Sequence, residues 1–203
     1  MNVTRAISMP IEKEKAAGVL FSALQFFRLD PSFHSLMNNE KLVAKQDFLG
    51  VFDRFQERNR VAAYTLTGLS ADCDILLWSV SPRLEDFIEM SNRLQESGFG
   101  KHLVLVRSHL GTLSAPGSGS RMLFVQPFPE EALAALTAPA PDAGGKLQVL
   151  DGRGLGEQPL VALFESDDPL AFRRVLARSP ETAGAPVHVC VLRDIRDLVD
   201  GIA

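Results

Sequence analysis

The chain has 203 residues, of which 46% are hydrophobic and 23% are charged, and its formal net charge is −4. This length allows one large domain or two small ones with a complete core, and the acidic balance without a basic patch argues against nucleic-acid binding. No apolar run is long enough to cross a membrane and no secretion signal is recognisable, so we expect a cytoplasmic protein without membrane contact.

The first elements form a strand and a long helix after a polar N-terminal arm at residues 1–15. Val19–Phe27 is rich in apolar and aromatic residues and predicts a strand, and Asp30-Pro31 behind it is typical of a helix start. The segment up to about Asn59 has apolar residues at helical spacing, namely Phe48, Val51, Phe52 and Phe55. Such a stripe indicates core packing rather than a cofactor site.

The next elements complete one structural unit. A strand that contains Tyr64 leads through Gly68 into a buried strand at Ile75–Trp78. An amphipathic helix at about 83–96 and a last strand at Lys101–Leu110 follow. The order strand–helix–strand–strand–helix–strand predicts a ferredoxin-like repeat over residues 16–113.

A small, flexible linker at Ser114–Ser120 divides this unit from residues 121–203. Behind the linker, Met122–Phe128 predicts a strand, and Pro129 begins a helix that cannot continue through Thr137–Gly145. The matching helix region of the first unit covers about 31–59, so a shortened helix is the main difference between the two units.

The second unit repeats landmarks of the first. Gly68 and Arg107 lie 39 residues apart, and so do Gly154 and Arg193, with a constant offset of 86. An offset shared by a turn glycine, a buried strand, a helix and a terminal strand indicates an internal repeat. We expect the two arginines to pair symmetrically with carboxylates at the repeat interface. The predicted fold is α+β: two tandem ferredoxin-like repeats whose sheets join as a barrel, with the helices outside and a pocket within the sheet.

Five segments carry a resemblance to a known family: Phe26–Pro31, Gly68–Trp78, Gly100–Leu103, Phe124–Phe128 and Gly154–Pro169. In these segments the chain resembles the chlorite dismutase-like proteins, which include the coproheme decarboxylases. The resemblance covers roughly residues 18–195. It implies a dimeric α+β barrel, assembly into dimers or pentamers, and haem or coprohaem in the C-terminal half.

The groups on which that family's chemistry depends are missing from the positions that correspond to them. The slot of the iron-binding histidine falls near Ala138–Pro141, which contains no histidine, and the slot of the decarboxylase tyrosine is Gln126. The slot of the distal arginine falls near Leu147, with Lys146 and Gln148 beside it. A lysine lacks the planar fork of a guanidinium. We therefore expect no catalytic residues and no cofactor. The candidates for lining a vacant pocket are Gln126, Lys146, Leu147 and Gln148.

The histidines and cysteines offer no obvious metal motif. His102 and His109 are seven residues apart around a strand, so we expect them on opposite faces. Either His109 or His188 replaces the missing iron ligand only if the fold brings it to the pocket, and a hydrogen-bonded strand histidine is the favoured interpretation of His188. Cys73 and Cys190 have neither a metal-ligand spacing nor a disulfide framework, and each lies in or beside an apolar strand, which predicts buried, reduced thiols.

Two further motifs have simple interpretations. Gly152–Gly156 lacks the residues of a phosphate-binding loop and predicts a plain turn. Glu165–Asp168 is a charged run before a proline and a helix, which indicates capping and solvation, with a surface acidic cluster for a partner as the alternative.

Two functions are compatible with this pattern. The first is a pseudoenzyme of the chlorite dismutase-like family that has lost haem-dependent catalysis and acts as a structural, regulatory or partner-binding protein. We expect it to form a homo-oligomer or to assemble with a related subunit. The alternative is a haem- or tetrapyrrole-binding oxidoreductase, of the chlorite dismutase or coproheme decarboxylase type, that uses an unfamiliar iron ligand.

Overall fold

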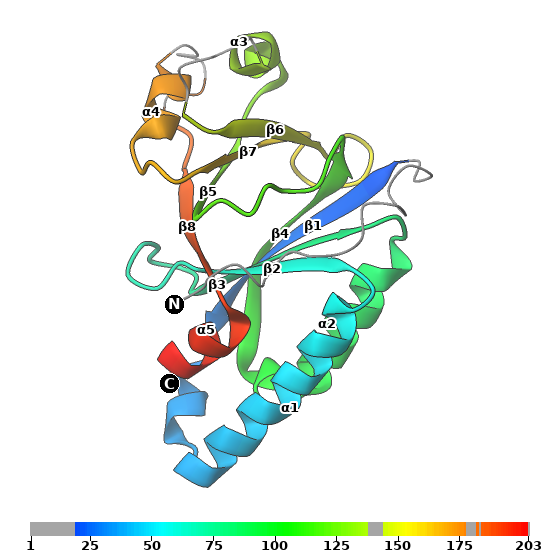
Figure 1. The fold of residues 1–203 in the computed structure, drawn as a ribbon, viewed down its shortest axis with the longest axis vertical. Coiled ribbons are helices and arrows are strands. Elements are labelled where there is room, and N and C mark those ends of the chain that lie inside the picture. The colour runs from blue at the N-terminus through cyan, green and yellow to red at the C-terminus, as the bar shows by residue number, and fades with distance from the viewer. Residues whose placement is uncertain (1–18, 138–143, 178–181, 183, 203) are drawn as a thin grey trace.

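The computed structural model describes residues 19–137, 144–177, 182 and 184–202 (Figure 1). Eight antiparallel strands form a closed barrel in the order β1-β3-β2-β8-β5-β7-β6-β4. The strands are β1 (Leu20–Leu29), β2 (Arg60–Thr65), β3 (Ile75–Ser81), β4 (Leu103–Leu113), β5 (Met122–Pro127), β6 (Lys146–Asp151), β7 (Leu160–Ser166) and β8 (His188–Arg193). The helices are α1 (Asn38–Gln56), α2 (Glu85–Glu96), α3 (Leu133–Thr137), α4 (Ala171–Leu176) and α5 (Ile195–Gly201).

The barrel consists of two ferredoxin-like sheets joined at two seams. The first half has the strand order β4-β1-β3-β2 and the second half has the equivalent order β8-β5-β7-β6. At one seam, residues Ala63–Thr65 of β2 pair with β8, and at the other Thr112 of β4 pairs with Asp151 of β6. The predicted α+β barrel with helices outside is therefore confirmed.

The two turn glycines occupy equivalent positions in this architecture. Gly68 has φ 77° and Gly154 has φ 76°, the left-handed region in which a residue without Cβ is unstrained. The amide of Leu69 donates to the carbonyl of Leu66 over 2.7 Å, and the amide of Leu155 donates to that of Gly152 over 2.9 Å. The offset of 86 holds across this turn, and Gly152–Gly156 is a turn as predicted. Alignment of β3 with β7 gives an offset of 85 residues, so that Trp78 in the first half is equivalent to Leu163 in the second.

Three separate hydrophobic clusters hold the layers together. The barrel interior contains residues from all eight strands or their flanking loops, including Leu24, Phe26, Tyr64, Trp78, Leu123, Leu163 and Cys190. The outer face of the first half packs against α1, α2 and α5 through residues that include Phe33, Phe48, Phe52 and Phe55. The outer face of the second half packs against α3 and α4, at the opposite end of the molecule (Figure 1). The strand β3 is buried along its whole length because it is covered on both faces.

Three sequence-based expectations differ from the structure. The barrel interior is filled by the cluster around Phe26 and Trp78, and the C-terminal cavity lies between the sheet and α3 and α4, reaching the end of β4 at its seam with β6. Arg107 and Arg193 are not in matching places, because β4 continues to Leu113, so that Arg107 lies in mid-strand while Arg193 ends β8. Arg107 pairs with a carboxylate of its own half, Asp72.

The charged run Glu165–Asp168 is only partly a capping feature. Asp168 does cap the turn before α4, since its carboxylate accepts from the amide of Leu170 over 2.9 Å. Glu165, however, is 1% exposed. Its carboxylate accepts hydrogen bonds from the amides of Ser118 and Gly119 at 2.8–2.9 Å. The linker segment is thus fixed across one end of the barrel by a buried acid.

Candidate functional site

The C-terminal half contains a cavity of about 780 Å³ between the outer face of β6 and β7 and the helices α3 and α4. Its size lies within the usual range of small-molecule pockets. The apolar part of its lining comes from the sheet, both helices and the end of β4 with the segments beside it: Val19, Leu113, Ala115, Leu133, Leu136, Leu147, Val149, Leu160, Phe164 and Val175. The polar part includes Lys146, Gln148, Asp151 and Arg153.

The cations of the cavity already have protein partners. Arg153 Nη2 lies 2.6 Å from Asp151 Oδ2, and its Nη1 lies 2.7 Å from Glu130 Oε1. Hydrogen bonds from Arg153 hold the pKa of the Asp151 carboxyl below its usual value. Lys146 Nζ lies 3.4 Å from the carbonyl oxygen of Pro116 in the linker.

The structure brings three of the four predicted pocket residues to this cavity. Lys146, Leu147 and Gln148 line it, and Gln148 also points its Nε2 toward the buried Glu165 carboxylate at 3.5 Å. Gln126 is not among the described lining residues. Its amide donates instead to the carbonyls of Thr182 and Ala185 at 3.1 and 3.2 Å. The predicted slot of the iron ligand, near residues 138–141, lies outside the described residues.

None of the four histidines lines the cavity. His34 belongs to the short 3₁₀ turn Pro31–Ser35 and His102 to the turn Gly100–His102, both on the N-terminal half. The rings of His109 and His188 lie inside the barrel against Phe26, with centroid distances of 5.8 and 5.0 Å. The described lining residues therefore do not fit a haem held by a histidine, because such a haem needs an imidazole nitrogen aimed at the iron.

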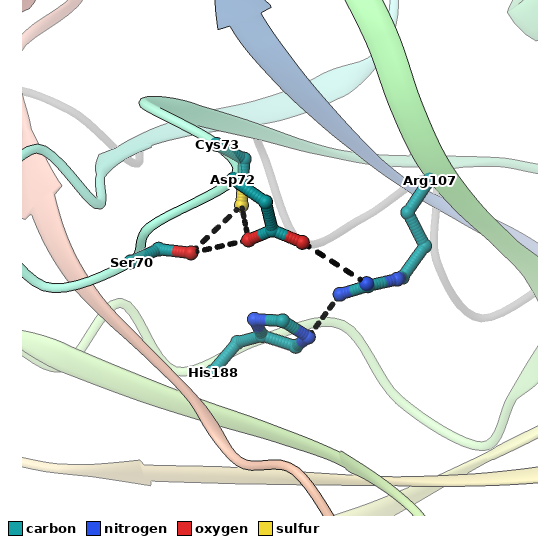
Figure 2. Close-up of polar contacts among 5 residues, drawn as sticks. All are labelled: Ser70, Asp72, Cys73, Arg107 and His188. Carbon is teal, nitrogen blue, oxygen red and sulfur yellow. Dashed lines mark hydrogen bonds and ion pairs between the residues drawn. The ribbon is translucent and has the colours of Figure 1, made fainter.

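A second polar site lies at the mouth of the barrel (Figure 2). It combines Ser70, Asp72 and Cys73 from the loop between β2 and β3 with Arg107 of β4 and His188 of β8. Arg107 donates to Asp72 Oδ2 over 3.2 Å and to His188 Nε2 in a close contact. Ser70 Oγ donates to Asp72 Oδ1 over 2.6 Å, and Cys73 Sγ lies 3.4 Å from the same oxygen.

Burial and hydrogen bonding set the charge states of this cluster. The hydrogen bond from Ser70 lowers the pKa of Asp72, so that the carboxylate is ionised. Burial and then the neighbouring Arg107 lower the pKa of His188, which keeps the imidazole neutral at pH 7. Burial raises the pKa of the Cys73 thiol. Asp72, Cys73 and His188 each present a ligand atom within 4.8 Å of the other two.

No local sequence pattern indicates this cluster. Asp72 and His188 lie in different repeats, and only closure of the barrel brings them together. The favoured interpretation of His188 as a hydrogen-bonded strand histidine is confirmed by its contact with Arg107. As expected, Cys73 and Cys190 are both buried and unpaired. His102 and His109 do not share a strand as predicted, because His102 belongs to the turn before β4.

The fold and both sites define a class of protein, the α+β barrels that are built from two ferredoxin-like repeats with a cavity under the C-terminal helices. The sequence model of the chlorite dismutase family, described as "Chlorite dismutase", matches residues 41–117. No curated protein matches the chain. Among the described residues, none of the helices is both long and apolar enough for a membrane span.

Solved structures of chlorite dismutases share the fold across nearly the whole chain. A mutant chlorite dismutase from Candidatus Nitrospira defluvii in complex with cyanide has a TM-score of 0.79 at 17% identity and covers 95% of this chain and 99% of its own. The enzyme from the same organism in complex with imidazole gives 0.77 at 15% identity, with coverages of 94% and 98%. A putative chlorite dismutase gives 0.73 at 15% identity, with coverages of 92% and 100%. The chain therefore has the chlorite dismutase fold, and the family model over residues 41–117 supports the resemblance predicted from its motifs.

Proposed function

We propose that this protein is a chlorite dismutase-like pseudoenzyme that does not use haem and acts as a binding or structural subunit. The observation that carries the proposal is the position of the histidines: all four lie away from the C-terminal cavity. A second observation agrees with it, because the ring of Phe172 on α4 stacks with those of Phe124 and Phe164 on the sheet at centroid distances of 5.3 Å. Packed aromatic rings occupy space in this layer that a flat cofactor would need.

One observation favours the second candidate, a tetrapyrrole-binding protein with an unfamiliar iron ligand. The cavity is large enough for a small molecule, and Lys146 and Arg153 on its lining are cations of the kind that binds carboxylates. Both cations already contact protein oxygens. The first candidate needs no rearrangement of these contacts, and we prefer it for that reason.

The surface of β4 supports assembly with further copies of the chain. Val104, Leu105 and Val106 are consecutive and 38–41% exposed. In the described part of the chain, β4 pairs with β6 only at Thr112 and Asp151, which leaves the other edge of Val104–Val106 open. An apolar edge strand is a template for pairing with another strand. Light scattering after size exclusion should show an oligomer, and Leu105→Lys should shift it toward the monomer.

Titration with haemin and coprohaem, followed in the Soret region, tests the proposed function. We expect no sharp, saturable band from the folded protein. His109→Ala and His188→Ala serve as controls, because a band that disappears in one of them would identify an unfamiliar iron ligand and would overturn the proposal.

A gain-of-function variant makes a negative result informative. Leu136 on α3 is buried and lines the cavity. If the cavity admits the macrocycle and lacks only a ligand, Leu136→His should bind haem where the parent protein does not. The proposal expects weak or no binding by both proteins, because the phenylalanine stack also limits the space.

A further inference from the structure

The cluster at the mouth of the barrel has the composition of a metal site. We infer that Asp72, Cys73 and His188 bind a divalent cation of the zinc type, and that Arg107 occupies the cation position in the metal-free protein. This inference is independent of the proposed function, because Asp72, Cys73 and His188 are not among the residues that line the C-terminal cavity.

The donor set determines the class of metal. A thiolate, an imidazole and a carboxylate are the ligands that Zn²⁺ takes in proteins, and three protein ligands leave a fourth position open. Hard cations such as Mg²⁺ and Ca²⁺ prefer oxygen donors alone. The three ligand atoms lie within 4.8 Å of one another, so small side-chain rotations bring them to one centre.

The backbone under these ligands is well anchored. The amide of Asp74 donates to the carbonyl of Phe27 over 2.8 Å, and the amide of Leu66 donates to the carbonyl of Asp74 over 2.7 Å, which fixes both ends of the loop that carries Asp72 and Cys73. His188 begins β8 and pairs with Val125 of β5. Ligands on fixed supports lose little conformational entropy when they bind a metal.

Arg107 supplies the second observation that points to a cation. Its guanidinium contacts the same Asp72 carboxylate and the same His188 ring that would ligate the metal. A guanidinium has donors only, so His188 Nε2 accepts, and its lone pair is aimed at a positive charge (Figure 2). The Arg107 side chain is 33% exposed, so solvent is available to receive it when a metal displaces it.

A metal at this position would connect the two repeats. Asp72 and Cys73 belong to the first repeat and His188 to the second. Because the unfolded chain does not hold these ligands together, the metal would stabilise the folded barrel in proportion to its occupancy.

Cobalt and zinc titrations of the full chain test the inference. Co²⁺ should give a thiolate-to-metal charge-transfer band in the near ultraviolet, and Zn²⁺ should displace it and raise Tm. Cys73→Ser and His188→Gln should remove both signals. Arg107→Gln should tighten Co²⁺ binding by about tenfold or more, because it removes the competing cation.

Matched variants keep the result decisive. Cys190→Ser changes the other buried thiol and His34→Gln changes an exposed histidine, and both should leave the band and the metal-induced rise in Tm unchanged. Where Cys73→Ser does not fold by circular dichroism, Asp72→Asn, at a partly exposed position, replaces it. No band in either the parent protein or Arg107→Gln would overturn the site, as would a band of equal affinity in His188→Gln.

Discussion

The two outer layers of the barrel differ although the sheets beneath them share one topology. In the first half, the 19-residue helix α1 lays Phe48, Phe52 and Phe55 on the sheet and fills the layer. In the second half, the equivalent helix α3 has five residues, and a cavity of about 780 Å³ lies beside it. In the described part of the chain, the longer helix goes with a packed layer and the shorter helix with a cavity.

A pocket that arises in this way does not imply a cofactor, since the side chains around it decide what it binds.

In the barrel interior, too, equivalent strand positions of the two halves have different neighbours. His109 pairs with Leu24 in the first half, and His188 pairs with Val125 in the second. The two histidines therefore occupy equivalent positions. His188 contacts Arg107, whereas both ring nitrogens of His109 lack a partner among the described residues.

The largest expected effect concerns the barrel interior that both halves share. Trp78 packs beside Tyr64, and its Nε1 donates to Ser22 Oγ over 2.8 Å. Trp78→Ala should lower the free energy of unfolding by about 3–5 kcal/mol, because it leaves a cavity and an unpaired hydroxyl. Urea denaturation measures the loss, with the counterpart Leu163→Ala for comparison. A loss below about 1 kcal/mol would contradict the packing described for β3.

Acidification should destabilise the barrel interior through His109. Burial lowers the pKa of His109 from 6.5 to about 4. The unfolded chain therefore takes up this proton first as the pH falls, so stability is complete above pH 6.5 and declines down to about pH 4. The contribution of His109 to this loss is on the order of 3 kcal/mol. Denaturation of the parent protein and of His109→Leu at several pH values measures it, and parallel pH profiles would exclude the assignment.

The role of Glu165 can be tested by replacing it with the residue at the equivalent position of the first half. Alignment of β3 with β7 places Val80 opposite Glu165. Glu165→Val should cost about 1–3 kcal/mol, because the amides of Ser118 and Gly119 lose their acceptor. Glu165→Gln, which keeps one acceptor oxygen, should cost less. Hydrogen exchange at the two linker amides should accelerate in the valine variant, and unchanged exchange would refute the anchoring role.

The smallest expected effect is the difference in unfolding free energy between two substitutions, one in each outer layer. Phe52 and Phe164 are both fully buried, but only Phe164 borders the cavity. Removal of a ring beside an existing void loses fewer contacts, so Phe164→Ala should cost about 1 kcal/mol less than Phe52→Ala. Equal losses in guanidinium denaturation would indicate that the C-terminal layer is packed as tightly as the N-terminal one.

Local patterns in the sequence were sufficient to predict most of the fold. The Phe48–Phe55 stripe, the turn glycines Gly68 and Gly154, and the shortened second helix all depend on neighbouring residues, and each is present in the structure. Register between distant strands carries no local signal. For that reason the sequence offset pairs Arg107 with Arg193, whereas in the structure Arg107 contacts His188.

The candidate sites were harder to predict because they depend on burial. Glu165 belongs to a charged run that is typical of a surface, yet its strand turns it into the barrel. Lys146, Leu147 and Gln148 do line the C-terminal cavity, and they were chosen from the family resemblance, as the slot of the distal arginine. The contact between Asp72 and Arg107, by contrast, depends on how the loop after β2 folds over the barrel mouth.

The proposal that the protein does not use haem is tested by its haem content. The protein is isolated for this purpose from cells that are supplied with a haem precursor. A pyridine haemochrome assay measures haem per chain without any assumption about the ligand. Because no histidine lines the C-terminal cavity, we expect a haem content far below stoichiometric. Stoichiometric haem in a folded preparation would contradict it.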